Sequence, residues 1–282
     1  MKTLQKTAIS AAAVVLLAGL ASASAFAADT PENPEDAAAP SPIAANVTVV
    51  SDYRYRGISQ SNFKPAIQGG FDYAHESGFY IGNWNSSISW ISDANSAGGK
   101  NNVSAPIEMD FYAGIKKELI GEGFASDLGV LQYYYPTTGM PSNATNPNTT
   151  EIYAAQNYTF GPVAGFVKFS YAVTNTFGYS NSSGSYYPDL TANYDTGVWG
   201  LALNAHVGYQ KIAGQNVVAG VPTASYTDWK LGLTKDFGGG LALAAAYIGT
   251  NAAKSGSTYA YQSPSGKNLG GSTGIVSLTK TF

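Results

Sequence analysis

A short segment near the start of the chain carries charged residues that could act on passing ions. Residues 51–60 read SDYRYRGISQ. In an extended strand, alternation places three charged side chains on one face: Asp52, Arg54 and Arg56. Facing segments offer three carboxylates: Asp72, Glu108 and Asp110. An arginine row opposite carboxylates in a narrow lumen would select ions. The alternative is ion pairing that fills and rigidifies the lumen, and the two interpretations are compatible.

Three further polar residues are candidates for lining a lumen: Lys168, Asn204 and His206. An asparagine, a histidine and a serine can form a nucleophilic catalytic set, but no motif places a serine beside His206. No phosphate-binding loop, zinc-binding helix or nucleophile elbow stands out. We therefore expect no enzymatic activity, no cofactor and no metal, and we interpret these residues as ordinary lining residues.

The segments that must position these residues alternate with a period of two. In residues 199–210, one face carries an aliphatic row with an aromatic residue at each end: Trp199, Leu201, Leu203, Ala205, Val207 and Tyr209. The opposite face carries Asn204 and His206. Ten steps of ~3.3 Å give ~33 Å of strand. At a tilt of ~40° this projects to ~25 Å, the height of the apolar band of a membrane barrel.

Twelve such segments are predicted along the chain. They are 46–56, 65–75, 78–90, 106–117, 124–135, 149–160, 163–174, 185–195, 198–210, 224–236, 240–250 and 272–282. The connections between them alternate between short turns and long, polar loops. An even strand number with this alternation is typical of outer-membrane barrels, whose tight turns face the periplasm and whose long loops face outward. The predicted fold class is all-β: a transmembrane antiparallel β-barrel of about twelve strands.

The two ends of the chain predict its compartment. Residues 1–27 resemble a cleaved signal peptide, with Lys2 and Lys6 before an apolar stretch and small residues up to Ala27. Residues 28–45 contain repeated prolines and are predicted to be a disordered periplasmic lead-in. The barrel is expected over 46–282. Its last residue, Phe282, resembles the signal read by the outer-membrane assembly machinery, so that machinery and outer-membrane lipid are the expected partners.

The composition agrees with this compartment. Charged residues make up only 12% of the chain, with 20 tyrosines and no cysteine, whereas soluble domains carry about 25% charged residues. The formal net charge of −3 offers no basic surface for nucleic acid. No stretch after the signal peptide has the ~18 consecutive apolar residues of a membrane helix.

Three motifs resemble the TorF family, whose members are classed as porins. The first is SDYRYRGISQS at residues 51–61, the second is PAIQGGFDY at 65–73, and the third is GFYIGNW at 78–84. The central loops carry no motif that can be aligned. The resemblance implies a pore without naming a solute, and it marks six residues of interest: Asp52, Tyr53, Arg56, Gly57, Gln60 and Trp84.

We therefore expect a bacterial outer-membrane, porin-like channel for small hydrophilic solutes or ions. A non-conducting structural or adhesive barrel is the alternative, and a barrel enzyme is a weaker one. Twelve strands lie between small, filled barrels and wide porins, so a narrow or partly occluded lumen is expected.

Overall fold

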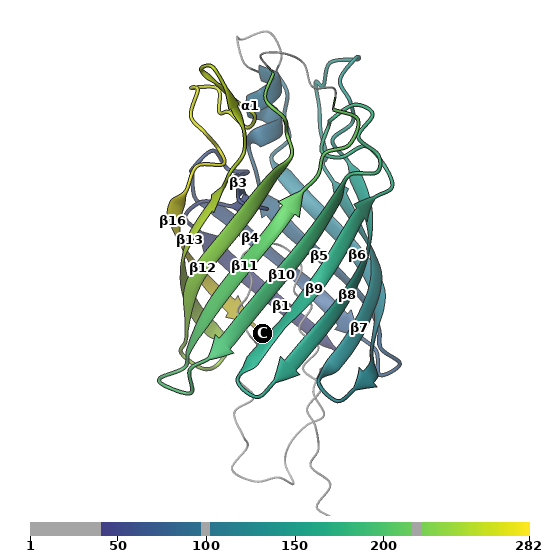
Figure 1. The fold of residues 1–282 in the computed structure, drawn as a ribbon, viewed down its shortest axis with the longest axis vertical. Helices are drawn as coiled ribbons and strands as arrows, with labels where there is room; N and C mark the ends of the chain where they lie inside the picture. The colour runs from purple at the N-terminus through teal and green to yellow at the C-terminus, as the bar shows by residue number, and fades with distance from the viewer. Residues whose placement is uncertain (1–40, 97–101, 216–220) are drawn as a thin grey trace, which may run out of the picture.

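The computed structural model describes residues 41–96, 102–215 and 221–282. Its main body is a closed antiparallel barrel of twelve strands, in the spatial order β1-β16-β13-β12-β11-β10-β9-β8-β7-β6-β5-β4 (Figure 1). Wall strands that follow one another along the chain lie side by side in the barrel. Two short hairpins are not part of the wall. The prediction of a twelve-stranded all-β barrel is confirmed.

The wall strands have the following bounds. They are β1 (Ile43–Val50), β4 (Ala66–Ala74), β5 (Phe79–Ser87), β6 (Ile107–Gly121), β7 (Phe124–Tyr134), β8 (Thr149–Phe160), β9 (Val163–Ala172), β10 (Tyr186–Asp195), β11 (Leu201–Gln210), β12 (Tyr226–Asp236), β13 (Leu241–Thr250) and β16 (Thr273–Thr281). Four short strands lie outside the wall: β2 (Arg54–Tyr55), β3 (Ile58–Ser59), β14 (Lys254–Ser255) and β15 (Thr258–Tyr259).

The first and last strands close the barrel. Val47 in β1 lies opposite Lys280 in β16 on one side and Gly69 in β4 on the other. The backbone N–H of Phe282 also donates to the carbonyl of Ala45. Closure leaves no wall strand with an unpaired edge, as a barrel surrounded by hydrocarbon requires.

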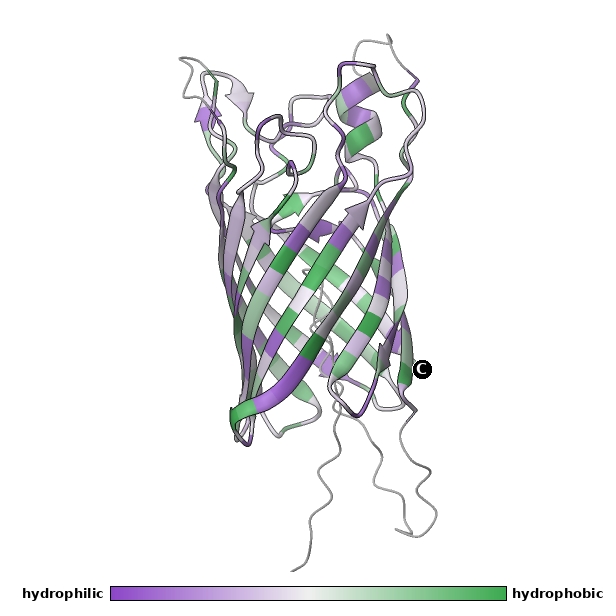
Figure 2. Ribbon diagram, turned by 90° about the vertical axis from the view of Figure 1, so that its right-hand side faces the viewer, coloured by the Kyte–Doolittle hydropathy of each residue, from purple (hydrophilic) through white to green (hydrophobic). Residues whose placement is uncertain are grey.

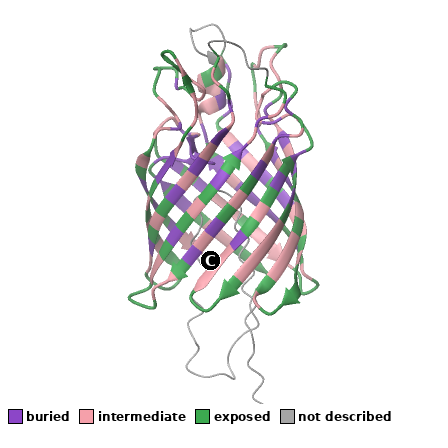
Figure 3. Cartoon of the chain, in the orientation of Figure 1, coloured by how far each residue is buried: buried purple, intermediate pink, exposed green. Residues whose placement is uncertain are grey.

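Side chains alternate between the two surfaces of the wall, as the sequence predicts. In β11, Leu203 is 47% exposed on the outside, whereas Asn204 is 5% exposed on the inside. The same alternation runs along the neighbouring strands, where exposed and buried residues form a chequered pattern (Figure 3). Exposed aliphatic and aromatic side chains therefore cover the exterior, as lipid requires, while polar side chains face the lumen.

The two ends of the barrel differ. One end carries short turns, such as the one between β8 and β9, and the C-terminus lies near it (Figure 1). The other end carries the long connections, which stand above the wall and include helix α1 (Trp90–Ser96) (Figure 2). The expected segregation of turns and loops is present. We refer to the long-loop end as the outer end.

Several predicted boundaries are wrong. The strand predicted at 46–56 is β1, which begins at Ile43 and ends at Val50, because the chain then turns into the lumen. Trp90, predicted as the end of a strand, begins helix α1 instead. Trp199, predicted in the lipid-facing row of β11, lies in the preceding turn with φ of 54° and is 81% exposed.

The signal peptide predicted at 1–27 and most of the lead-in predicted at 28–45 lie outside the described residues, although Ile43–Ala45 belong to β1. In the described part of the chain, no helix is long and apolar enough to cross a membrane.

Candidate functional site: a hairpin across the lumen

Residues 51–65 leave the wall and fold into the barrel; we call them the lumen hairpin. Val50 in β1 pairs directly with Ala66 in β4, so the residues between them have no place in the wall. Within the hairpin, β2 pairs with β3 around the turn Arg56-Gly57. Both turn residues have positive φ, 45° and 78°, which is the conformation of a type I′ hairpin turn. This local geometry folds the segment back on itself instead of extending β1.

Arg54 braces the lumen hairpin from within. Its side chain is fully buried, and its Nε donates to Asp52 Oδ2 at 2.7 Å. Its Nη1 donates to the carbonyls of Gly57 and Gly271 at 2.9 and 2.8 Å. Asp52 in turn accepts a hydrogen bond from Ser59 Oγ at 2.6 Å. Arg54 therefore fixes the shape of the hairpin and ties it to the loop before β16.

Arg56 crosses to the opposite wall. Its Nη2 lies 2.7 Å from Glu151 Oε2 on β8, and its Nη1 donates to Gln210 Oε1 on β11. Its guanidinium also lies 4.0 Å from the ring centre of Tyr187 on β10. Strands β8, β10 and β11 lie across the barrel from β1. The hairpin turn is thus anchored on the far side of the lumen.

Two tyrosines of the lumen hairpin contact a third part of the wall. The Tyr53 hydroxyl donates to Glu108 Oε1 on β6, and Tyr135 donates to Glu108 Oε2 at 2.7 Å. The Tyr55 hydroxyl bonds that of Tyr133 on β7. The hairpin therefore touches β6, β7, β8 and β11 and divides the lumen into an outer and an inner part.

The structure agrees only in part with the prediction that an arginine row faces carboxylates across the lumen. Asp52, Arg54 and Arg56 lie inside the barrel, but they lie in the hairpin and not on a wall strand. Their ion-pair partners are not the predicted ones, since Arg54 pairs with Asp52 and Arg56 with Glu151. Glu108 and Asp110 do face the lumen from β6, and both are buried.

The remaining motif residues gather on the same feature. Gly57 forms the hairpin tip, where a Cβ would lie 2.5 Å from Thr250 Cγ2. Gln60 donates from Nε2 to the Ile58 carbonyl within the hairpin. Trp84 faces inward from β5 and belongs to the buried cluster around Tyr53. The residues singled out by the family resemblance thus build the lumen hairpin and its support.

The inner part of the lumen carries a second polar network on the wall. His206 lies between two carboxylates, with Nδ1 at 3.0 Å from Asp189 and Nε2 at 2.8 Å from Asp228. Asn204 donates to Asn193 and accepts from Thr234, both at 2.8 Å.

The opposite side of the inner lumen pairs tyrosines with charged residues. Asp72 accepts from Tyr112 at 2.5 Å, and Asp127 accepts from Tyr80 at 2.6 Å. Lys168 on β9 lies between the two sides, opposite Asp189 of β10 in the register and 4.3 Å from the ring centre of Tyr153 on β8. Asp72, Lys168, Asn204 and His206, predicted to line the lumen, therefore face it. The His206 network adjoins the hairpin, because the Tyr187 ring contacts the Arg56 guanidinium and the Tyr187 hydroxyl bonds His206.

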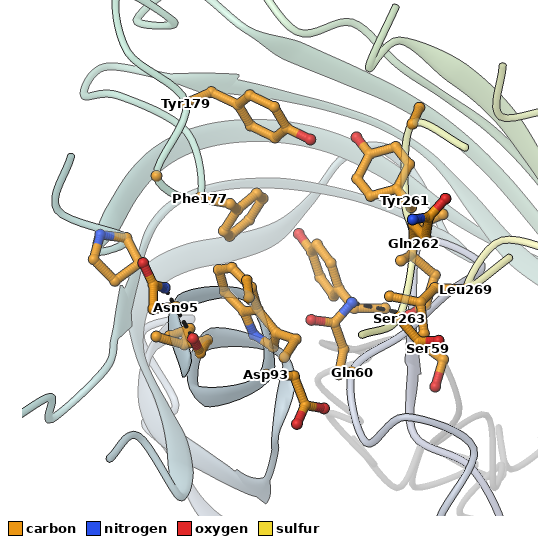
Figure 4. A pocket seen from close by; sticks show the side chains of 18 of the residues that line it. Ser59, Gln60, Asp93, Asn95, Phe177, Tyr179, Tyr261, Gln262, Ser263 and Leu269 are labelled. Carbon is orange, nitrogen blue, oxygen red and sulfur yellow. Dashed lines mark hydrogen bonds between the residues drawn. The ribbon is translucent and has the colours of Figure 1, made fainter. Parts of the chain in front are cut away.

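A cavity of about 440 Å³ lies at the outer end, above the lumen hairpin; we call it the vestibule. Its floor includes Tyr55, Ile58 and Gln60 of the hairpin. Side chains from helix α1 and from the long, polar loops complete the lining (Figure 4). Burial raises the pKa of Tyr179 and of Tyr261 in these loops, so both phenols stay neutral at physiological pH. The vestibule wall is therefore aromatic and largely uncharged.

Sequence reasoning misses several residues of this site. Glu151 and Gln210 hold Arg56, and alternation along their strands would place both side chains on the lumen face. The vestibule residues Phe177, Tyr179 and Tyr261 are missed because their loops are otherwise polar, and the available signal is that large aromatic residues are unusual in solvated loops. Within the described residues, no group of three or more metal-ligating side chains gathers.

Comparison with known proteins places the chain in a family and a fold. The barrel, with its apolar exterior and polar lumen, is of the outer-membrane type. The chain belongs to the family described as bacterial proteins of unknown function (Gcw_chp), whose model matches residues 34–282. None of the curated proteins compared with it matches the sequence.

Solved structures share the architecture at low sequence identity. The NanC porin is 8% identical with a TM-score of 0.51, and the match covers 85% of this chain and 98% of NanC. The KdgM porin is 7% identical with a TM-score of 0.50, covering 85% of this chain and 99% of KdgM. The outer-membrane phospholipase A from Escherichia coli is 13% identical with a TM-score of 0.45, covering 86% and 95%. The similarity to the NanC and KdgM porins shows the shared fold.

Proposed function

We propose that this protein is a porin-like channel of the bacterial outer membrane, with the lumen hairpin as its constriction. One observation carries the proposal: a closed barrel with a lipid-compatible exterior encloses a charged lumen that a single braced hairpin divides. A purely structural barrel needs no such division. A channel does, because a narrow, charged constriction sets which solutes pass.

The charges of the lumen support passage of hydrophilic solutes. Carboxylates outnumber cationic side chains on the inward faces and the hairpin. The acidic residues are Asp52, Asp72, Glu108, Asp110, Asp127, Glu151, Asp189 and Asp228. The basic ones are Arg54, Arg56, Lys64, Lys116, Lys168 and Lys230. Such a lumen attracts cations and repels anions, so we expect a weak cation preference.

A non-conducting barrel is the second candidate, and one observation favours it. Tyr53 and Arg54 are 1% and 0% exposed, so the hairpin packs tightly where it crosses the lumen. For a barrel enzyme the support is weaker. In the described part of the chain, the His206 ring contacts Asp189, Asp228, Tyr187 and Thr191, with no serine nucleophile among these partners.

The proposal includes two partners in the cell, outer-membrane lipid and the assembly machinery. The exposed apolar belt fits outer-membrane lipid as the surrounding partner, and Phe282, 74% exposed after β16, fits recognition by the assembly machinery. The three N-terminal motifs, which build the hairpin and its support, favour membership of the TorF porins within this setting. No cofactor is required.

Single-channel recording tests the proposal. Purified protein is inserted into planar bilayers, and current steps are recorded in potassium chloride with neutral polymers of increasing size. A channel gives discrete steps that only polymers small enough to enter can reduce. The control is the same preparation heated until the barrel unfolds. Correctly inserted protein that shows no steps would support the non-conducting barrel instead.

A further inference from the structure

The vestibule has the composition of a small-ligand site. Its described lining includes seven aromatic residues: Tyr55, Trp90, Tyr135, Phe177, Tyr179, Tyr226 and Tyr261. They come from the lumen hairpin, helix α1, strand β12 and three outer loops, so distant parts of the chain converge here. At about 440 Å³ the cavity falls within the range of small-molecule sites, roughly 300–1,000 Å³.

The rings are arranged so that faces remain available. Tyr226 and Tyr261 meet at 78° with ring centres 5.2 Å apart, and Tyr55 and Phe177 meet at 72° and 5.4 Å. Edge-on pairs of this kind hold each other without stacking face to face. Figure 4 shows Phe177, Tyr179 and Tyr261 around the hollow, with Gln60 and Gln262 among them.

Polar groups without charge lie between the rings. The lining includes the amide side chains of Gln60, Asn62 and Gln262. Among the described lining residues, Asp93 alone carries a charge, and its carboxylate already accepts from Ser89 Oγ at 2.8 Å. An entirely apolar ligand would strip water from these amides without replacing their hydrogen bonds, which is costly.

Charged ligands fit this lining poorly. An anion would meet no lysine, arginine or histidine among the described lining residues. A quaternary ammonium ion could bind aromatic faces, but the Tyr55 ring already contacts a cation, since the Arg56 guanidinium lies 4.8 Å from its centre. A sugar matches both features, because its C–H faces pack on aromatic rings while its hydroxyls bond amides and phenols.

We propose that the vestibule binds neutral mono- or disaccharides directly above the lumen hairpin. This inference rests on the proposed channel, for which it names a substrate class. The floor of the site is the hairpin itself, so a bound sugar occupies the position from which it would pass the constriction.

Calorimetric titration of the folded protein tests the site. The detergent must lack a sugar head group, and the probes are maltose, digalacturonate and tetramethylammonium. We expect saturable binding of maltose and none of the two charged probes. Tyr261→Ala should weaken maltose binding about tenfold, equivalent to about 1.4 kcal/mol. Tyr259→Ala is the matched control, because this tyrosine lies on the same loop outside the lining, and it should leave affinity unchanged.

The outcomes separate the binding site from the channel. If Tyr261→Ala does not fold, Phe177→Leu serves in its place and should weaken binding in the same direction. Absence of saturable maltose binding, tighter binding of a charged probe, or equal weakening by Tyr259→Ala would overturn the proposal. Maltose binding by a non-conducting protein would support the site while refuting the channel, and conductance without binding would do the reverse.

Discussion

The barrel wall and the lumen hairpin are built on opposite principles. The wall repeats one rule over twelve strands, with apolar side chains outward, polar side chains inward and every strand paired on both sides. The hairpin has only two short paired strands and is held by particular contacts, chiefly those of Arg54 and Arg56. The wall therefore accounts for residence in a membrane, and the hairpin accounts for the arrangement of charges across the lumen.

This difference predicts where substitutions act. The effect of a substitution in the wall on stability should depend on how deep the residue lies in the membrane and on which surface it faces, and little on its neighbours. The effect of a substitution in the hairpin should depend on which particular contact is lost.

The largest expected effect is on the lipid-facing wall. Ala244 and Ala245 are adjacent in the middle of β13, the first facing the lumen and the second facing outward. Ala245→Arg should lower the free energy of unfolding by about 2–4 kcal/mol, because a cation at the membrane midplane is poorly solvated. Ala244→Arg should cost clearly less, since its guanidinium can reach a wet lumen. Urea unfolding in lipid vesicles measures both, and equal costs would contradict the inward and outward assignment.

A smaller effect is expected at the hairpin tip. In Gly57→Ala, the new methyl group meets Thr250 and Asp228, and the backbone must keep φ of 78°. We expect a loss of about 1–3 kcal/mol in unfolding free energy. Gly274→Ala in β16 is the control, because nothing lies within 4 Å of its Cβ position, and it should change stability by less than about 0.5 kcal/mol. A tolerated Gly57→Ala would mean that the tip does not press against the wall.

The smallest effect concerns ion selectivity. Arg56→Gln leaves Glu151 without its partner and should shift the reversal potential in a salt gradient toward cations. Glu151→Gln should shift it toward anions. Each change should alter the permeability ratio roughly twofold to fivefold, as expected for one charge in a partly screened lumen. The double variant should return close to the wild-type value, and shifts of the same sign in both single variants would refute the pairing.

How much of this structure is predictable from sequence follows from the same contrast. Alternation predicts the wall because lipid imposes it on every strand, so the lipid-facing row around Leu203 is recognisable residue by residue. Strand ends are less certain, because a turn can hold an aromatic residue as readily as a strand can. Trp199 shows this, lying in a turn where alternation alone would extend β11.

The lumen hairpin escapes the same reasoning because its residues also alternate. Asp52, Arg54 and Arg56 alternate with tyrosines, which is the pattern expected of a wall strand. The distinguishing signal is that the opposite row, Ser51, Tyr53 and Tyr55, contains no aliphatic residue suited to the middle of a bilayer. Its tertiary partners, such as Glu151, come from strands about a hundred residues away, and single-sequence patterns do not encode that pairing.

The most direct test of the central claim is to remove the hairpin and leave the wall. Residues 53–63 are replaced by a short glycine–serine linker between the paired ends of β1 and β4, and single-channel conductance is compared with that of the intact protein. The variant should still insert as a folded barrel, conduct in larger steps and admit larger neutral polymers, because the constriction is gone. A folded, inserted variant with the same conductance and polymer cut-off as the intact protein would contradict the claim that this hairpin limits passage.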